Sequence, residues 1–168
     1  MSEIITTEEV TAAATAFLTA FDQLDWEPFS RFIAPDATVF MPFANVQRRL
    51  EGKAAIEAVF ADFFARVRQE RSGPSYLDIR PVDLDIHLLG DSALVTFHLD
   101  NGVTLSRRTA IFQKRAGEWY LLHLHASNMA IGDGDSSLVK SAELYAQIYA
   151  SDEELQELTD QAAADWPE

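Results

Sequence analysis

The residues with the clearest chemical potential in this sequence are three histidines. His123 and His125 are separated by one residue, which places both imidazoles on one face of a strand, as in strand-borne zinc sites. His98 could add a third imidazole from a neighbouring strand. No carboxylate or other ligand is obviously placed to complete the set, so we interpret the histidines as metal-free and expect no metal and no cofactor.

A second candidate for metal chemistry is the run Gly-Asp-Gly-Asp-Ser at residues 132–136, which has the alternating aspartates of a calcium loop. Such a loop needs Gly at its sixth position and Glu at its twelfth. The sequence has Leu138 and Leu144 there. We therefore predict a turn at this point.

Acid–base chemistry would require a different pair, Arg108 and a carboxylate such as Asp22. The arginine would polarise a substrate oxygen while the carboxylate accepts a proton. Asp22 adjoins Phe21 on an expected helix, where an acidic side chain is more often solvated. An isomerase, cyclase or dehydratase built on this pair is the alternative hypothesis for the function.

Three helices are expected in the first part of the chain, and the first of them carries Asp22. Thr6 followed by Glu9 has capping-box spacing, and apolar residues then recur every three to four positions. Asp25 is a suitable N-cap for a second, short helix that ends before Pro35. Gly52 precedes a third helix with a broad apolar stripe. The expected helices cover about residues 7–24, 26–33 and 53–68, and two short strands, 37–43 and 46–50, lie between the second and the third.

After residue 74 the apolar period changes from 3.6 to two, and turn residues divide the chain into short segments. We predict four consecutive antiparallel strands at 77–89, 93–99, 103–115 and 118–128. Helices followed by a meander indicate an α+β fold with the helices packed on one face of the sheet. We expect residues 1–131 to form this domain and residues 132–168 to form an acidic helical extension.

Alternation along the strands separates an inward face from an outward face. The inward face is largely apolar, with Leu122 among its members, and aromatic side chains of the helices would cover it. It would form either a filled core or a pocket for a flat or aliphatic ligand with two polar groups, Arg108 and Asn128. The candidate pocket residues are Phe17, Phe21, Met41, Phe60, Phe64, Phe97, Leu99, Arg108, Phe112, Leu124 and Asn128.

The outward face carries imidazoles, hydroxyls and few formal charges, which is a suitable composition for an interface. Its expected members are His87, Thr96, His98, Ile111, Gln113, His123, His125 and Ser127. We predict a homodimer through this face. Imidazoles buried there in the neutral form would have depressed pKa values, so mild acid would weaken the dimer.

Three segments also carry a resemblance to a known family. They read Asp-Trp-Glu-Pro-Phe at 25–29, Ile-His-Leu-Leu-Gly-Asp-Ser-Ala-Leu-Val at 86–95 and Gly-Glu-Trp-Tyr-Leu-Leu-His-Leu-His-Ala-Ser at 117–127. These segments resemble the nuclear transport factor 2-like superfamily in its SnoaL-like branch, and most closely the association domain of calcium/calmodulin-dependent protein kinase II. The resemblance spans about residues 6–128. It implies a cone-shaped fold, in which a curved antiparallel or mixed sheet carries the N-terminal helices on its concave face, and pairing through the outer face.

The resemblance implies no single activity, because this fold hosts isomerases, cyclases, dehydratases, transport factors and oligomerisation modules. Ketosteroid isomerases of the superfamily use an Asp before a Pro on the first strand and a Tyr on the first helix. The corresponding residues here are Met41 and Phe17, which cannot exchange a proton. The basic cavity positions of the kinase association domain correspond to Ile56, Leu99, Ala110 and Ala126.

We therefore interpret the chain as a small-molecule-binding or oligomerisation module with an apolar pocket and no recognisable catalytic set. Its pocket would accept neutral or weakly acidic apolar molecules and exclude multivalent anions.

Composition excludes several other classes of protein. The chain has 168 residues, a net charge of −14 and no cysteine, so nucleic-acid binding, thiol catalysis and disulfides are not expected. It has no signal-peptide pattern and no run of about 18 apolar residues, so we expect no membrane contact and a cytoplasmic location. The net charge of residues 129–168 is −9. We predict helices at 138–149 and 153–166 that fold against the domain or a partner subunit.

Overall fold

The computed structural model describes residues 5–131, and the predicted turn at 132–136 and the predicted tail helices lie outside this range. The described part contains three helices followed by most of the sheet. None of its helices is long and apolar enough to span a membrane. The cytoplasmic location stays a prediction.

The three helices begin where the sequence signals placed them. In α1 (Thr7–Asp22), the Thr6 side chain accepts a hydrogen bond from the Glu9 backbone N–H at 3.3 Å. In α2 (Trp26–Ser30), the Asp25 carboxylate caps the Glu27 N–H at 3.2 Å. The third helix, α3 (Lys53–Glu70), follows Gly52, whose φ of +82° is readily adopted by glycine.

Six strands form one sheet in the order β2-β1-β6-β5-β4-β3. Neighbouring strands are antiparallel except β1 and β6, which are parallel. The strands are β1 (Ile33–Phe40), β2 (Leu50–Glu51), β3 (Pro81–Leu89), β4 (Ser92–Asp100), β5 (Thr104–Arg115) and β6 (Glu118–Ala130). The last four are the predicted meander, so the α+β class is confirmed.

The strand boundaries before the meander differ from the prediction. The second helix ends at Ser30 and β1 starts at Ile33, because the backbone here pairs with β6: the Phe32 carbonyl accepts from the Leu121 N–H at 2.6 Å. Pro35 lies within β1 and has no N–H to donate, and the register with β6 shifts between Ile33 and Thr38. The predicted strand at 46–50 is reduced to Leu50–Glu51, and β3 begins at Pro81 rather than at residue 77.

The prediction of the inward face is wrong for one residue, Leu122. Ile111 pairs with His123 whereas the next residue, Phe112, pairs with Leu121, so Leu122 is the extra residue of a β-bulge in β6. Because side chains alternate along a strand, the bulge changes which residues face inward beyond it. Leu121 is therefore fully buried beside the helices, and Leu122 is only partly buried.

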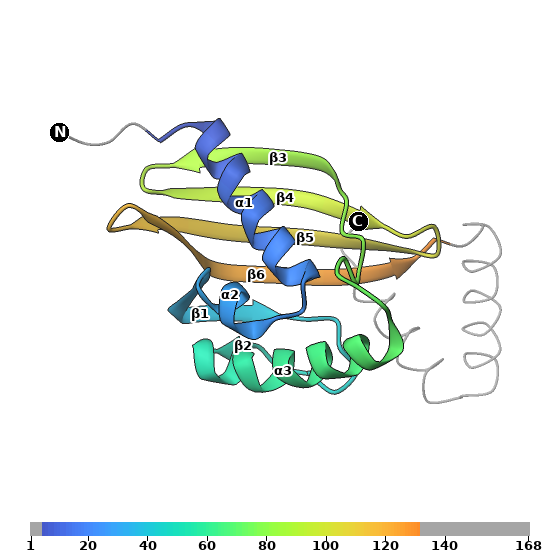
Figure 1. Cartoon of the computed structure of the whole chain (residues 1–168). Helices are drawn as coiled ribbons and strands as arrows, with labels where there is room; N and C mark the ends of the chain where they lie inside the picture. Colours follow the sequence, from blue (N-terminus) through green and yellow to red (C-terminus); the bar gives the residue numbers. More distant parts are fainter. Residues whose placement is uncertain (1–4, 132–168) are drawn as a thin grey trace, which may run out of the picture. The chain divides into compact units, whose positions relative to one another are not determined.

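The helices lie over the concave face of the curved sheet, as the resemblance implied. Figure 1 shows α1 crossing strands β3 to β6 and α3 running beside β1 and β2. Phe29 is 1% exposed, and its ring centroid lies 5.2 Å from that of Phe17 and 5.5 Å from that of Phe60. Aromatic side chains from all three helices thus form one core, which packs beside the cavities described below.

Candidate functional site

Two adjoining cavities lie between the helices and the sheet. The smaller one, called the inner chamber below, has a volume of about 30 Å³, which holds no more than about two water molecules. The larger one, the outer cleft, has a volume of about 510 Å³. Four residues line both: Phe21, Met41, Leu99 and Arg108. The two cavities therefore meet at these side chains.

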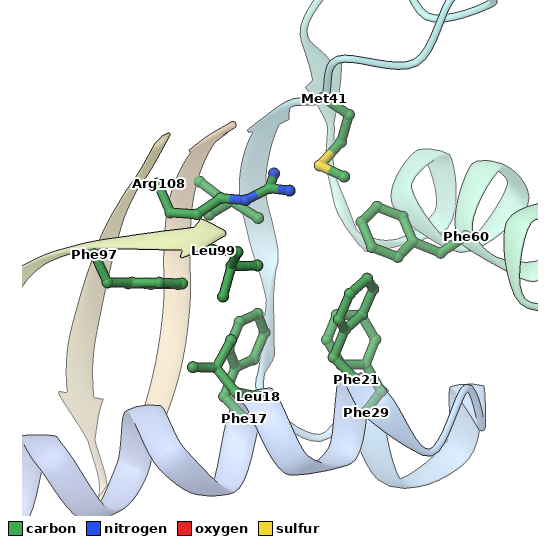
Figure 2. A pocket seen from close by; sticks show the side chains of 10 residues that line it. Phe17, Leu18, Phe21, Phe29, Met41, Phe60, Phe97, Leu99 and Arg108 are labelled. Atoms are coloured by element: carbon green, nitrogen blue, oxygen red, sulfur yellow. The ribbon is translucent and has the colours of Figure 1, made fainter. Parts of the chain in front are cut away.

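The inner chamber is lined almost entirely by apolar side chains from α1, α2, α3 and the sheet (Figure 2). Eight of the eleven candidate pocket residues line it, and Leu18 and Phe29 complete the wall. The eight are Phe17, Phe21, Met41, Phe60, Phe97, Leu99, Arg108 and Leu124. Leu18 follows the candidate Phe17 in α1, and Phe29 is a buried apolar residue of α2. Both belong to the apolar pattern from which the helices were predicted, so the sequence contained a signal for them.

The other three candidates lie elsewhere. Asn128 lines the outer cleft. Phe64 and Phe112 line neither cavity and are buried in the aromatic core, where the Phe112 ring centroid lies 5.5 Å from that of Phe17 and the Phe64 centroid 5.7 Å from that of Phe29. For these two residues the filled-core interpretation describes the structure better than the pocket interpretation.

The outer cleft is built mostly from segments that the sequence analysis did not connect with a site. They are the residues after β1, the last turn of α3, the segment before β3 and the β4–β5 turn. The lining residues that had not been predicted are Pro42, Phe43, Phe63, Val67, Glu70, Arg71, Leu77, Asp78, Ile79, Arg80, Asp100, Asn101, Thr104 and Ser106. Loop conformation brings these segments together, and hydrophobic periodicity carries no information about it.

Arg108 is the one candidate whose electrostatic environment is unusual. Burial lowers the pKa of its guanidinium to about 10, because the low-polarity surroundings disfavour the charged form. The group still carries its charge at neutral pH. Within residues 5–131, no side chain or carbonyl forms a hydrogen bond or ion pair with it. Figure 2 shows the guanidinium extending over Leu99 toward Met41, where the two cavities meet.

Two further polar groups follow Arg108 along the same face of the sheet. Ser106 is two residues away on β5 and is paired in register with Asn128 on β6. The Ser106 hydroxyl donates to the Asn128 side-chain oxygen at 2.7 Å, and Ser106 is only 6% exposed. Both residues line the outer cleft. The cleft thus has an apolar end at the inner chamber and a polar wall beyond it.

The charges that line the outer cleft balance formally. Its acidic residues are Glu70, Asp78 and Asp100, and its basic residues are Arg71, Arg80 and Arg108. Asp78 and Arg80 pair with each other at 3.0 Å, and both are well exposed. Arg108, at the inner end of the cleft, is therefore not paired with a carboxylate, and the acidic residues that balance its charge lie nearer the solvent.

The proposed acid–base pair of Arg108 and Asp22 is not brought together. Asp22 lines neither cavity. Its carboxylate accepts hydrogen bonds from the Leu77 N–H at 2.6 Å and from the Ser75 hydroxyl, and its carbonyl accepts from the Tyr76 N–H at 3.2 Å. Asp22 therefore fastens the segment 75–77 to the end of α1 and is a structural group.

The histidines lie on the outward face, as strand alternation predicted. His123 and His125 of β6 are paired with Ile111 and Thr109 of β5, so the whole of β5 separates them from His98 of β4. Within residues 5–131 no group of three His, Asp or Glu side chains is placed to hold a metal ion.

These imidazoles differ in their surroundings. The His123 ring lies 2.8 Å from the Thr38 hydroxyl, and its pKa is lowered by burial, by His125 and by Arg49. His87 and His98 instead have carboxylates beside them, Asp85 at 2.8 Å and Asp83 at 3.5 Å. His87 and His98 thus each have an anionic neighbour, whereas the charged groups that affect His123 are cationic.

Comparison with known proteins places the chain in a family. The model of the SnoaL-like domain matches residues 10–132, and the chain belongs to this family. No curated protein matches. Among solved structures, the chain is similar to a nuclear transport factor 2-like protein of unknown function from Pseudomonas putida, with 20% identity and a TM-score of 0.60 over 71% of this chain and 84% of that one.

Two other similar solved structures are named for different functions. One is a candidate dehydratase of the nuclear transport factor 2-like family from Streptomyces avermitilis, with 21% identity and a TM-score of 0.60 over 73% of this chain and 95% of that one. The other is the hub homology domain of calcium/calmodulin-dependent protein kinase II from Chlamydomonas reinhardtii, with 21% identity and a TM-score of 0.55 over 75% and 99%. At these identities the comparisons establish the fold, and the function has to be argued from the site.

Proposed function

We propose that this protein binds a small, largely apolar molecule in the outer cleft, with the end of the molecule against the inner chamber. The observation that carries the proposal is the size and position of the cleft. Its 510 Å³ lies within the range of about 300–1,000 Å³ that is usual for small-molecule sites. It opens against an aromatic wall inside the cone, where binding would remove apolar ligand surface from water.

The inner chamber alone is too small for such a molecule. Its 30 Å³ is what remains after the aromatic side chains have filled the concave face. The apolar lining predicted from the sequence therefore provides the closed end of the site, and the outer cleft provides the volume. This division combines the filled-core and pocket interpretations, which the sequence left as alternatives.

Binding is tested with the neutral, apolar fluorophore N-phenyl-1-naphthylamine. We expect saturable fluorescence enhancement with the wild-type protein, and about tenfold weaker binding by Met41→Trp, because Met41 lies where the cavities meet and a larger ring would fill that space. Met129→Trp is the matched control, since Met129 is exposed and lines neither cavity.

The opposite results have clear meanings. Absence of saturable binding by the wild-type protein would refute the proposed function. Equal binding by the Met41→Trp and Met129→Trp proteins, both folded by circular dichroism, would place the fluorophore outside the two cavities.

We also propose self-association through the outward face of the sheet. Phe40 supports this proposal: it is 39% exposed on β1, and its ring centroid lies 6.0 Å from that of His123 and 5.5 Å from that of His125. Aromatic and imidazole side chains are suitable for an interface. The similarity to a kinase hub domain is consistent with this proposal.

Light scattering after size exclusion at pH 8 tests self-association. We expect the mass of a dimer for the wild-type protein and of a monomer for Phe40→Asp, which places a charge in the contact. A wild-type monomer at micromolar concentrations would refute the interface.

A further inference from the structure

We propose that the ligand of the outer cleft is a monoanionic carboxylate with an apolar body, whose carboxylate is bound by Arg108 with Asn128 as a second hydrogen-bond donor. This inference rests on the proposed function, because it assigns the chemical class of the molecule that the cleft binds. It makes Arg108 the residue that determines specificity at the apolar end of the cleft.

The first argument is the unpaired state of Arg108. A guanidinium has five N–H donors, and a charged group removed from water is costly unless it is paired and hydrogen-bonded. The described part of the chain offers Arg108 no acceptor. A ligand carboxylate would supply the missing partner in the bidentate geometry that arginine prefers.

The position of Arg108 determines the orientation of the ligand. The guanidinium lies where the outer cleft meets the inner chamber. A carboxylate bound there leaves the apolar body of the ligand beside Phe21, Met41 and Leu99, which line both cavities. A carboxylate bound at the solvent-exposed rim would already find Arg71 or Arg80 and would not need the partly buried Arg108.

Asn128 provides the second donor. Its side-chain oxygen is occupied by the Ser106 hydroxyl at 2.7 Å. The amide N–H groups have no partner among residues 5–131 and lie in the lining of the same cleft as Arg108. The buried hydroxyl of Ser106 thus orients the amide so that its donors are available to an anion.

The charge balance of the cleft limits the ligand to one negative charge. Once one carboxylate has neutralised Arg108, the remaining charged residues of the lining are three acids, Glu70, Asp78 and Asp100, against two bases, Arg71 and Arg80, so the net charge that a second carboxylate meets is negative. The net charge of −14 on the chain adds a general repulsion of polyanions. The structure therefore favours an aromatic or aliphatic monocarboxylate over a dicarboxylate or a phosphate ester.

Competition against N-phenyl-1-naphthylamine tests the assignment with three probes of one shape. They are 2-naphthoate, its neutral amide 2-naphthamide, and naphthalene-2,6-dicarboxylate. We expect 2-naphthoate to bind the wild-type protein at least about tenfold more tightly than either of the other two. In Arg108→Met, 2-naphthoate should bind about ten- to a hundredfold more weakly, the loss expected for hydrogen bonds to a charged group.

Two variants complete the experiment. Arg66→Met is the matched control, because Arg66 is exposed on α3, lines neither cavity and undergoes the same change of charge. Asn128→Asp adds a negative charge beside the proposed carboxylate and should weaken 2-naphthoate without affecting 2-naphthamide. It tests the proposal independently if Arg108→Met does not fold.

The outcomes separate this inference from the function on which it rests. If the fluorophore binds but 2-naphthoate and 2-naphthamide compete equally, or if Arg108→Met and Arg66→Met bind 2-naphthoate alike, the carboxylate assignment is overturned and the apolar site stands. If the dicarboxylate binds most tightly, the restriction to one charge is overturned. If the fluorophore does not bind at all, the proposed function itself fails.

Discussion

The two faces of strands β4, β5 and β6 differ more than their shared backbone would suggest. On the inward face, apolar side chains surround Arg108, which no described group pairs with. On the outward face, imidazoles, hydroxyls and charged groups lie among partners, and His87 and His98 each have a carboxylate nearby. The inward face therefore has a charge without a partner, whereas the outward face has side chains that remain partly exposed to solvent.

This difference indicates what each face can bind. A partly buried charge without a partner specifies a small complementary group, because the energy gained depends on one close pair. A partly exposed surface with scattered apolar and polar groups specifies an extended partner, because each contact there contributes little. Strand alternation thus allows one sheet to carry a ligand site and an association surface whose residues adjoin in sequence.

The largest difference between the faces should be in stability. Phe29→Ala removes a ring that is 1% exposed and packs against Phe17 and Phe60, and we expect it to lower the free energy of unfolding by about 3–5 kcal/mol. Leu89→Ala, at a 57% exposed position of β3, should change it by less than about 0.5 kcal/mol. Urea denaturation measures both, and equal losses would contradict the assignment of the core to the inward face.

The next effect has the opposite sign. A pKa of about 10 for Arg108 means that keeping its cation in the folded state is costly at neutral pH. Arg108→Met keeps much of the apolar stem and removes the charge, so we expect the unliganded protein to gain about 1–3 kcal/mol of stability. Arg66→Met should be neutral. A loss of stability in the Arg108→Met protein would show that the guanidinium is stabilised where it is, in contradiction to its unpaired state.

The accuracy of the sequence-based prediction follows the same division. Periodicity predicted the helices and the meander, because burial imposes a repeat that sequence records, and eight of the candidate pocket residues line the inner chamber. It failed at Leu122, where a bulge changes the faces, and at β1, which pairs with a strand more than eighty residues away. The outer cleft was missed because residues 77–80, 100, 101 and 104 reach it through loop conformation.

The segment before β3 allows a third test. Asp22 holds residues 75–77 through the Leu77 N–H and the Ser75 hydroxyl, and Leu77 lines the outer cleft. We expect Asp22→Ala to lower stability by about 1–2 kcal/mol and to accelerate amide hydrogen exchange in residues 75–80. Asp62→Ala, on the exposed side of α3, is the control. Unchanged exchange in residues 75–80 would show that the segment is held by its other contacts.

The smallest effect concerns the outward face and its response to pH. Burial, His125 and Arg49 lower the pKa of His123 below its usual value near 6.5. Above that value the imidazole is neutral in both the folded and the unfolded chain, so it contributes no pH dependence. As the pH falls below 6.5, the unfolded chain binds a proton first, and stability decreases until the folded pKa has been passed.

His123→Gln removes this titration while keeping a side chain that can bond to the Thr38 hydroxyl. Between pH 7 and pH 5 we expect its melting temperature to fall less than that of the wild-type protein. The difference should correspond to only a few tenths of a kcal/mol, on the order expected where solvent screens a partly exposed group.

His87→Gln is the control, because His87 lies beside Asp85 rather than beside cations. If both variants lose as much stability as the wild-type protein, His123 is not the source of the acid sensitivity. If the dimer forms, it buries His123 further and lowers its pKa again, so the fraction of dimer should also fall over this pH range, and less in His123→Gln.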